Sequence, residues 1–119
     1  MKALLDFLRN TAAHIRTLEA DAHAALHEAG NEAHYRELMA AKARLLANLA
    51  HNAKPLLEHV PASHRQAIGD RLQAMSASAQ RSLDLGSVFY MSALLYPEDH
   101  TPGTPNDLEK WLAHLERLA

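Results

Sequence analysis

The strongest constraint on the fold is a stripe of apolar residues that recurs every three or four positions along most of the chain. In the first segment this stripe consists of Leu4, Leu8, Thr11, Ile15, Leu18, Ala22, Ala25 and Ala29. Spacings that alternate between four and three place these side chains on one face of a long amphipathic helix. Gly30 and Asn31 follow, and both tolerate the left-handed conformation that closes a helix. The pattern therefore predicts a helix from about Lys2 to Ala29.

A second segment with the same spacing begins at Asn31, a residue type that caps helix N-termini well. Its stripe consists of Tyr35, Met39, Lys42, Leu46, Leu49, Ala53, Leu56 and Val60. Pro55 lies inside this stripe and cannot donate a backbone hydrogen bond to His51, so we expect a kink or break near residues 51–54. Because the stripe keeps its phase across Pro55, the pattern favours a kinked helix over a reversal. Pro61 is expected to end the segment.

A third segment opens with Ser63, which Gln66 follows three residues later in the form of a capping box. Its stripe consists of Ile68, Leu72, Met75, Ala79, Ser82 or Leu83, Gly86, Tyr90 and Ala93. The stripe passes Gly86 without changing phase, which predicts one long helix that continues to about Tyr96. A loop is expected from Pro97 to Gly103.

A short fourth helix is predicted after this loop, because Thr104 is a suitable cap and Pro105 suits a first helical turn. Its expected buried face consists of Leu108, Trp111, Leu112, Leu115 and Leu118. The composition also favours helices, since 23 Ala and 20 Leu stand against two Val and two Ile. Short connections between long helices imply antiparallel neighbours. The sequence thus predicts an all-α single domain over residues 1–119, an antiparallel bundle of three long helices plus a short C-terminal fourth helix.

The composition excludes several classes of function. The absence of cysteine excludes disulfide scaffolds, thiolate zinc sites and cysteine nucleophiles. A net charge of −2 gives no attraction to nucleic acid or to an anionic membrane, so neither is expected as a partner. Glycine-rich phosphate loops, nucleophile elbows and dinucleotide fingerprints are missing, so the sequence leans away from an enzyme and predicts no cofactor. Without a signal peptide or a membrane-spanning stretch, a cytoplasmic location is expected.

Lys42 is unusual because it lies at the centre of an apolar stripe, between Met39 and Leu46. Lysine is almost never fully buried without a partner. If the first two helices fold back at Gly30 and Asn31, Lys42 faces Glu19. The sequence therefore predicts an ion pair between these two side chains. We expect it on the flank of the helix pair, partly exposed and contributing at most about 1 kcal/mol.

The nine histidines suggest an alternative function based on histidine chemistry. His23 and His27 are four residues apart on one helix face, a spacing that lets two imidazoles bind one metal ion. His34, just past the turn, is the candidate third ligand. Adding nine positive charges to the net charge of −2 gives +7, so the total charge is also sensitive to pH near neutrality. The alternative is a metal-binding or pH-sensing bundle.

Two short motifs resemble known families. Arg9 and His14, in the string Arg-Asn-Thr-Ala-Ala-His, resemble the catalytic motif of the HEPN superfamily of helical ribonucleases. This resemblance implies RNA cleavage, with an arginine and a histidine on adjacent turns to handle a phosphate and a proton. The stretch from His51 to Leu56 is similar to the phospho-acceptor region of histidine-kinase dimerisation helices, which implies an accessible histidine beside a proline kink.

The part of the third segment that follows Gly86 is apolar on all its faces, and such a helix must be covered on all its faces. The first two helices can cover one side of it and the short fourth helix a second. The other faces are covered either by the four helices of one chain alone or, as we expect, by a second copy of the chain in a two-fold contact. The residues expected at this contact are Phe89, Met91, Leu95, Tyr96 and Trp111. The sequence therefore favours a non-enzymatic interaction or structural module that forms a homodimer or binds another protein.

Overall fold

The computed structural model describes all 119 residues and is entirely helical, which confirms the predicted all-α class. The elements are α1 (Lys2–His27), α2 (Glu32–Ala47), α3 (Leu49–Ala53), the 3-10 helix η1 (Lys54–His59), α4 (Ala62–Asp84), α5 (Val88–Ala93) and α6 (Asp107–Leu118). The molecule is elongated and measures 48 × 29 × 25 Å. None of these helices is long and apolar enough to cross a membrane.

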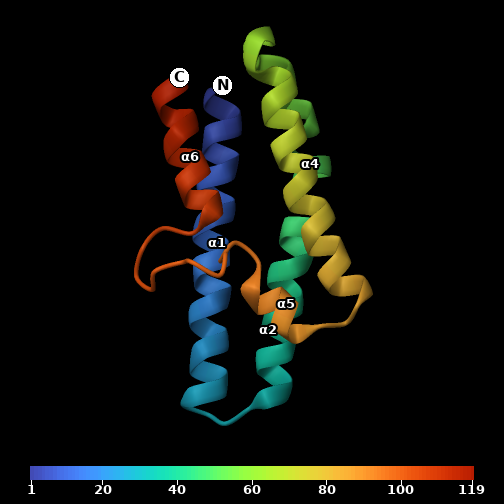
Figure 1. Cartoon of the computed structure of the whole chain (residues 1–119), viewed down its shortest axis with the longest axis vertical. Coiled ribbons are helices and arrows are strands. Elements are labelled where there is room, and N and C mark those ends of the chain that lie inside the picture. Colours follow the sequence, from blue (N-terminus) through green and yellow to red (C-terminus); the bar gives the residue numbers. More distant parts are fainter.

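Helices α1 and α2 form an antiparallel hairpin that turns at the lower end of the molecule (Figure 1). Gly30 adopts a φ of 62° in this turn. The side chain of Asn31 accepts a hydrogen bond from the backbone N–H of His34, which confirms Asn31 as the cap of α2. Apolar residues from both helices of the hairpin join a single buried core, among them Ala22 and Met39.

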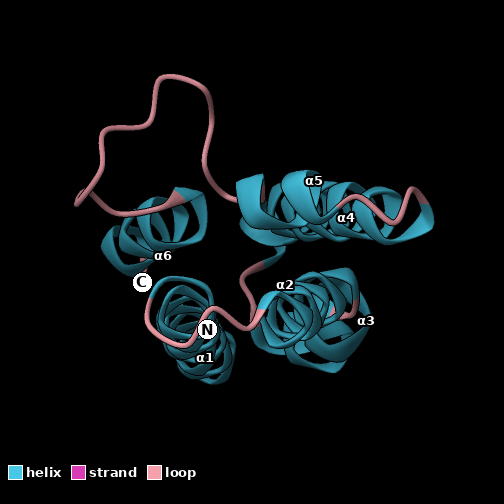
Figure 2. Cartoon of the chain, turned by 90° about the horizontal axis from the view of Figure 1, so that it is seen from below, coloured by secondary structure: helices cyan, strands magenta, loops and turns pink.

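The remaining helices form a second layer on this hairpin. Viewed end-on, α6 covers α1, whereas α4 and α5 cover α2 (Figure 2). In the long direction, α6 lies beside the N-terminal half of α1, so the two chain ends are neighbours (Figure 1). The apolar core between the layers includes Leu8, Ile15, Leu46, Leu72 and Leu115. The architecture therefore places α5 and the segment that follows it near the middle of one face.

The second segment breaks earlier than its proline suggests. α2 ends at Ala47, and the chain continues as α3 and then as η1, which has Pro55 in its first turn. The buried hydroxyl of Ser76 on α4 donates to the carbonyl of Leu46 and accepts from the N–H of Ala50, both at 2.9 Å. One side chain thereby satisfies two backbone groups at the break, which stabilises it inside the core.

The prediction of one helix through Gly86 is wrong. α4 ends at Asp84, and Gly86 takes a left-handed φ of 62°. The N–H of Gly86 bonds to the carbonyl of Leu83, and the N–H of Ser87 bonds to that of Ser82. These two bonds form a Schellman motif, which satisfies the last carbonyls of α4. The side chain of Ser87 then caps α5, so a new helix begins with a new phase.

Two predicted helix caps are also wrong. α4 has Pro61 at its N-cap position and no side-chain cap, so Ser63 does not begin a capping box. α6 is capped by Asn106 instead of Thr104. Asn106 accepts from the N–H of Glu109, and the Glu109 carboxylate accepts from the N–H of Asn106. This reciprocal pair satisfies two backbone donors, which a Thr104 cap would not achieve at this helix start.

Candidate functional site

The predicted partners Lys42 and Glu19 are brought together in the interior. The Nζ atom of Lys42 lies 3.1 Å from the Glu19 carboxylate and donates to the carbonyl of Ser92 at 3.0 Å. The Lys42 side chain is 0% exposed, so this pair does not lie on a solvated flank as the sequence suggested. Burial lowers the pKa of Lys42, and the nearby Glu19 charge opposes that shift. The pair thus fixes the end of α5 to the hairpin.

The same cluster continues to Tyr96, beyond α5. The Tyr96 hydroxyl donates to the Glu19 carboxylate at 2.7 Å, and its ring lies 5.0 Å from the ammonium of Lys42. Burial, and then the hydrogen bond to Glu19, raise the pKa of Tyr96 to about 12. Because the charged groups are paired with one another, this cluster serves to hold the segment after α5 in place.

A second ion pair holds the start of α6. The Arg16 guanidinium donates to both carboxylate oxygens of Glu109, at 2.6 and 3.0 Å. This contact holds the pKa of Glu109 below its usual value and raises the pKa of Arg16. The two-pronged geometry is the strong form of an arginine–carboxylate contact. Both ends of the segment between α5 and α6 are therefore tied to α1.

Large apolar side chains are exposed on α5 and at the end of α4 that precedes it. Phe89 is 75% exposed, Leu85 is 62% exposed and Tyr90 is 53% exposed. The rings of Phe89 and Tyr90 pack edge to face with their centroids 5.8 Å apart. Leu85 and Tyr90 line the same surface cleft, so the three side chains share one region of the surface. We call Leu85, Phe89 and Tyr90 the α5 patch.

The α5 patch differs from the surface expected from the sequence. Met91 and Trp111 pack inside the core of this chain, and Leu95 and Tyr96 are half-buried. Of the five residues expected at a contact, only Phe89 is exposed. Sequence reasoning missed the outward positions of Leu85 and Tyr90, because the helix phase changes at Gly86. A signal for this change was present, since glycine followed by serine suits a helix end and a new cap.

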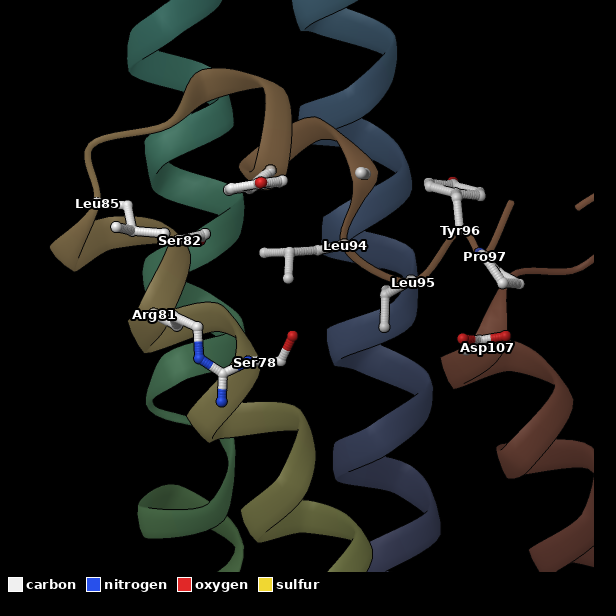
Figure 3. Close-up of a pocket in the computed structure, with 11 residues that line it drawn as sticks. Ser78, Arg81, Ser82, Leu85, Leu94, Leu95, Tyr96, Pro97 and Asp107 are labelled. Carbon is white, nitrogen blue, oxygen red and sulfur yellow. The ribbon is translucent and has the colours of Figure 1, made fainter. Parts of the chain in front are cut away.

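An open cleft lies beside the α5 patch. It has a volume of about 540 Å³ and adjoins a second cleft of about 300 Å³ that extends toward Leu46. Figure 3 shows Arg81 and Ser78 of α4 on one side and Asp107 of α6 on the other, with Leu94 and Leu95 between them. Ser78, Leu94, Leu95 and Asp107 line both clefts. We call the two clefts together the α4–α6 groove.

The three histidines proposed as metal ligands do not form a metal site. The rings of His23 and His27 lie 4.4 Å apart, but no three His, Asp or Glu side chains are placed to hold a metal ion. His34 lies beyond the turn, where its ring nitrogen is 3.6 Å from the Glu37 carboxylate. His34 therefore does not join His23 and His27 in a three-ligand group.

The charged and imidazole side chains of the two family resemblances, Arg9, His14 and His51, lie on the surface. Arg9 pairs with Asp6 at 3.0 Å and with Glu116 at 3.4 Å. His14 is exposed on the same helix, and His51 is exposed on α3. No protein-family model, curated protein or solved structure matches this chain. A functional proposal must therefore rest on the surfaces described above.

Proposed function

We propose that this antiparallel helical bundle is a non-enzymatic interaction module that forms a homodimer through the α5 patch. The observation that carries this proposal is the exposure of Leu85, Phe89 and Tyr90 in one region of the surface. Apolar patches of this kind are typical of protein interaction sites. Aromatic side chains that are buried in a contact also contribute more to the free energy of association than most other side chains.

The chain exposes more surface area than a typical folded monomer of its mass, which supports a contact with a partner. The chain exposes 7034 Å², whereas a folded monomer of 13.2 kDa exposes about 6,400 Å². The excess is about 600 Å², which approaches the roughly 800 Å² that each partner buries in an interface of standard size. A dimer contact on α5 would bring the exposed area toward the range of compact proteins.

A second copy of this chain is the partner that best fits the patch. Residues 85–97 contain no charged side chain. A two-fold contact places a surface against itself, so any charge near the axis would oppose a like charge. The α5 patch avoids that repulsion and can pair Phe89 and Tyr90 with the same residues of a second copy.

The proposal is tested by sedimentation velocity over a wide dilution series. The wild-type chain is expected to show twice its monomer mass of 13.2 kDa at high concentration and to dissociate on dilution. Phe89→Asp places a charge in the contact and should give a monomer at the same concentrations. Leu118→Asp is the matched control, because Leu118 is an exposed leucine at the far end of α6. It should dissociate as the wild type does.

Two results would overturn the proposal. One is a wild-type chain that stays monomeric at every accessible concentration. The other is an equal effect of the Phe89→Asp and Leu118→Asp substitutions, because a general response to surface charge would explain both. Circular dichroism of each variant establishes that the helices are intact.

A further inference from the structure

We propose that the α4–α6 groove binds a monocarboxylate with a slim apolar chain, and that Arg81 holds its carboxylate. This site adjoins the dimer contact, because Leu85 and Tyr90 line the groove and also belong to the α5 patch. The two clefts of the groove, about 540 and 300 Å³, fall within the range of small-molecule sites. The ligand class follows from the chemistry of the lining, the contact between α4 and α6 and the strain at the centre of the groove.

One face of α4 forms a wall along the whole groove. The lining residues of this wall are spaced by three and four, and they are Arg71, Ala74, Met75, Ser78, Arg81, Ser82 and Leu85. Fourteen steps at 1.5 Å give a wall of about 21 Å. Leu94 and Leu95 lie across the groove from the middle of this wall (Figure 3). The groove therefore offers an extended surface on which polar side chains lie among apolar ones.

The polar group that selects an anion is Arg81. Its guanidinium forms no ion pair or hydrogen bond within this chain, unlike the guanidinium groups of Arg9 and Arg16. Ser78 lies one turn earlier on the same face of α4 and has a hydroxyl available to donate. A guanidinium matches a carboxylate in a two-pronged hydrogen bond. Arg81 and Ser78 together thus fit one carboxylate.

Asp107 limits the ligand to a single acid group. Its carboxylate lines both clefts on the side opposite Arg81 (Figure 3). Asp107 is the first residue of α6, where the helix dipole favours a negative charge. A second carboxylate on the ligand would be repelled there, whereas an apolar chain that passes between the leucines would not.

A contact between α4 and α6 favours a single chain over a helical peptide as the ligand. The Arg71 guanidinium of α4 lies 5.9 Å from the centre of the Trp111 ring of α6. This contact joins the two walls at one end of the groove. A helix about 10 Å wide cannot lie between walls that are joined in this way. An unbranched acyl chain against Met75, Leu94 and Leu95 does not require the walls to separate.

A strained residue marks the centre of the groove. Leu95 has a φ of 75°, which is unfavourable for a bulky side chain. Strain of this kind clusters at ligand sites, where the surrounding structure holds it in place. Here the carbonyl of Leu95 accepts from the N–H of Asp107 at 3.0 Å, and its side chain lines both clefts. The strain thus directs an apolar side chain into the groove.

Titration calorimetry with decanoate tests this site. We expect saturable binding with one decanoate per chain, and Arg81→Gln should weaken it about 10- to 100-fold, the range for losing a charged hydrogen bond. The matched control is Arg117→Gln, because Arg117 is also exposed and without an ion pair but lies on the last turn of α6. It should bind decanoate as the wild type does. Decanol lacks the carboxylate, so wild type and Arg81→Gln should bind it equally.

Methyl NMR locates the apolar chain, since decanoate should shift the methyl signals of Leu94, Leu95 and Met75. The site would be refuted by the absence of saturable binding to the wild type, or by equal affinity of the wild type and Arg81→Gln. Equal weakening by Arg117→Gln would refute it as well. The Phe89→Asp variant separates this proposal from the dimer, because its monomer should still bind decanoate.

Discussion

Replacing Lys42 by methionine should destabilise the chain by about 3 kcal/mol. The Lys42 side chain is 0% exposed, and methionine fills a similar unbranched volume, so the loss is electrostatic and not a cavity. Removing one member of a buried pair costs about 3–5 kcal/mol. Glu19 is 18% exposed and keeps its hydrogen bond from Tyr96, which places the loss at the lower end. The unfolding entropy that is typical of a chain of this length converts this loss of stability into a melting temperature lower by about 12 °C.

The matched control is Lys2→Met. Lys2 also pairs with a carboxylate, that of Asp6 at 2.8 Å, but its side chain is 88% exposed. Water screens exposed pairs of this kind, so Lys2→Met should leave the stability almost unchanged. Glu19→Gln completes a double-mutant cycle with Lys42→Met. The double variant should be more stable than the sum of the single effects predicts, by at least about 1.5 kcal/mol, because it buries no lone charge.

Urea denaturation followed by circular dichroism measures all these variants at one fixed chain concentration, because dimer formation would make the midpoint depend on concentration. Equal effects of Lys42→Met and Lys2→Met on the free energy of unfolding would show that burial of the lysine does not determine the loss of stability. Additivity of the single effects within about 0.5 kcal/mol would show that Lys42 and Glu19 do not interact energetically. Either result would refute the reasoning.

Thermal denaturation checks three further predictions. Gly86→Ala should cost about 1 kcal/mol through backbone strain alone, because φ is 62° and no atom lies within 4 Å of an added Cβ. Gly69→Ala, inside α4, should instead stabilise by about 0.5–1 kcal/mol, since its added Cβ meets only Leu57 at 3.8 Å. Asn106→Ala should cost about 1–2 kcal/mol, because it removes the cap of α6, and equal stability of this variant and the wild type would contradict that role.

The hairpin could be predicted from sequence because the residues that determine its two helices and its turn are neighbours in the chain. The alternating spacing of apolar residues identified both helices, and the turn at Gly30 and Asn31 fixed their register. Once that register was set, the position of Lys42 on the stripe placed it opposite Glu19. The burial of the ion pair between Lys42 and Glu19 was not predictable, because the α5 segment that covers it is distant in sequence.

The second half of the chain was less predictable because apolar periodicity does not show where a residue in the left-handed conformation ends a helix. The stripe ran through Gly86 in phase, yet the Schellman bonds at this residue ended the helix. Asn106 rather than Thr104 caps α6 because Glu109, three residues later, completes its capping box. This signal was present in the sequence, but the prediction followed the adjacent Thr-Pro pair instead. With the phase reset, Met91 turned inward and Tyr90 outward, which moved the candidate interaction surface.

Alkaline titration should identify Tyr96 as the tyrosine that anchors the segment after α5. Burial and the hydrogen bond to Glu19 raise its pKa to about 12, so its phenolate absorbance should develop near that pH in the folded chain. Subtracting the titration of Tyr96→Phe from that of the wild type isolates this group. An unfolded tyrosine loses its proton near pH 10, so the stability contributed by Tyr96 is complete below pH 10 and falls as the pH rises toward 12. Far-UV circular dichroism on the same samples shows whether the chain is still folded. A Tyr96 signal that develops near pH 10 with unchanged circular dichroism would mean that the hydroxyl is solvated, and that Glu19 does not hold this segment.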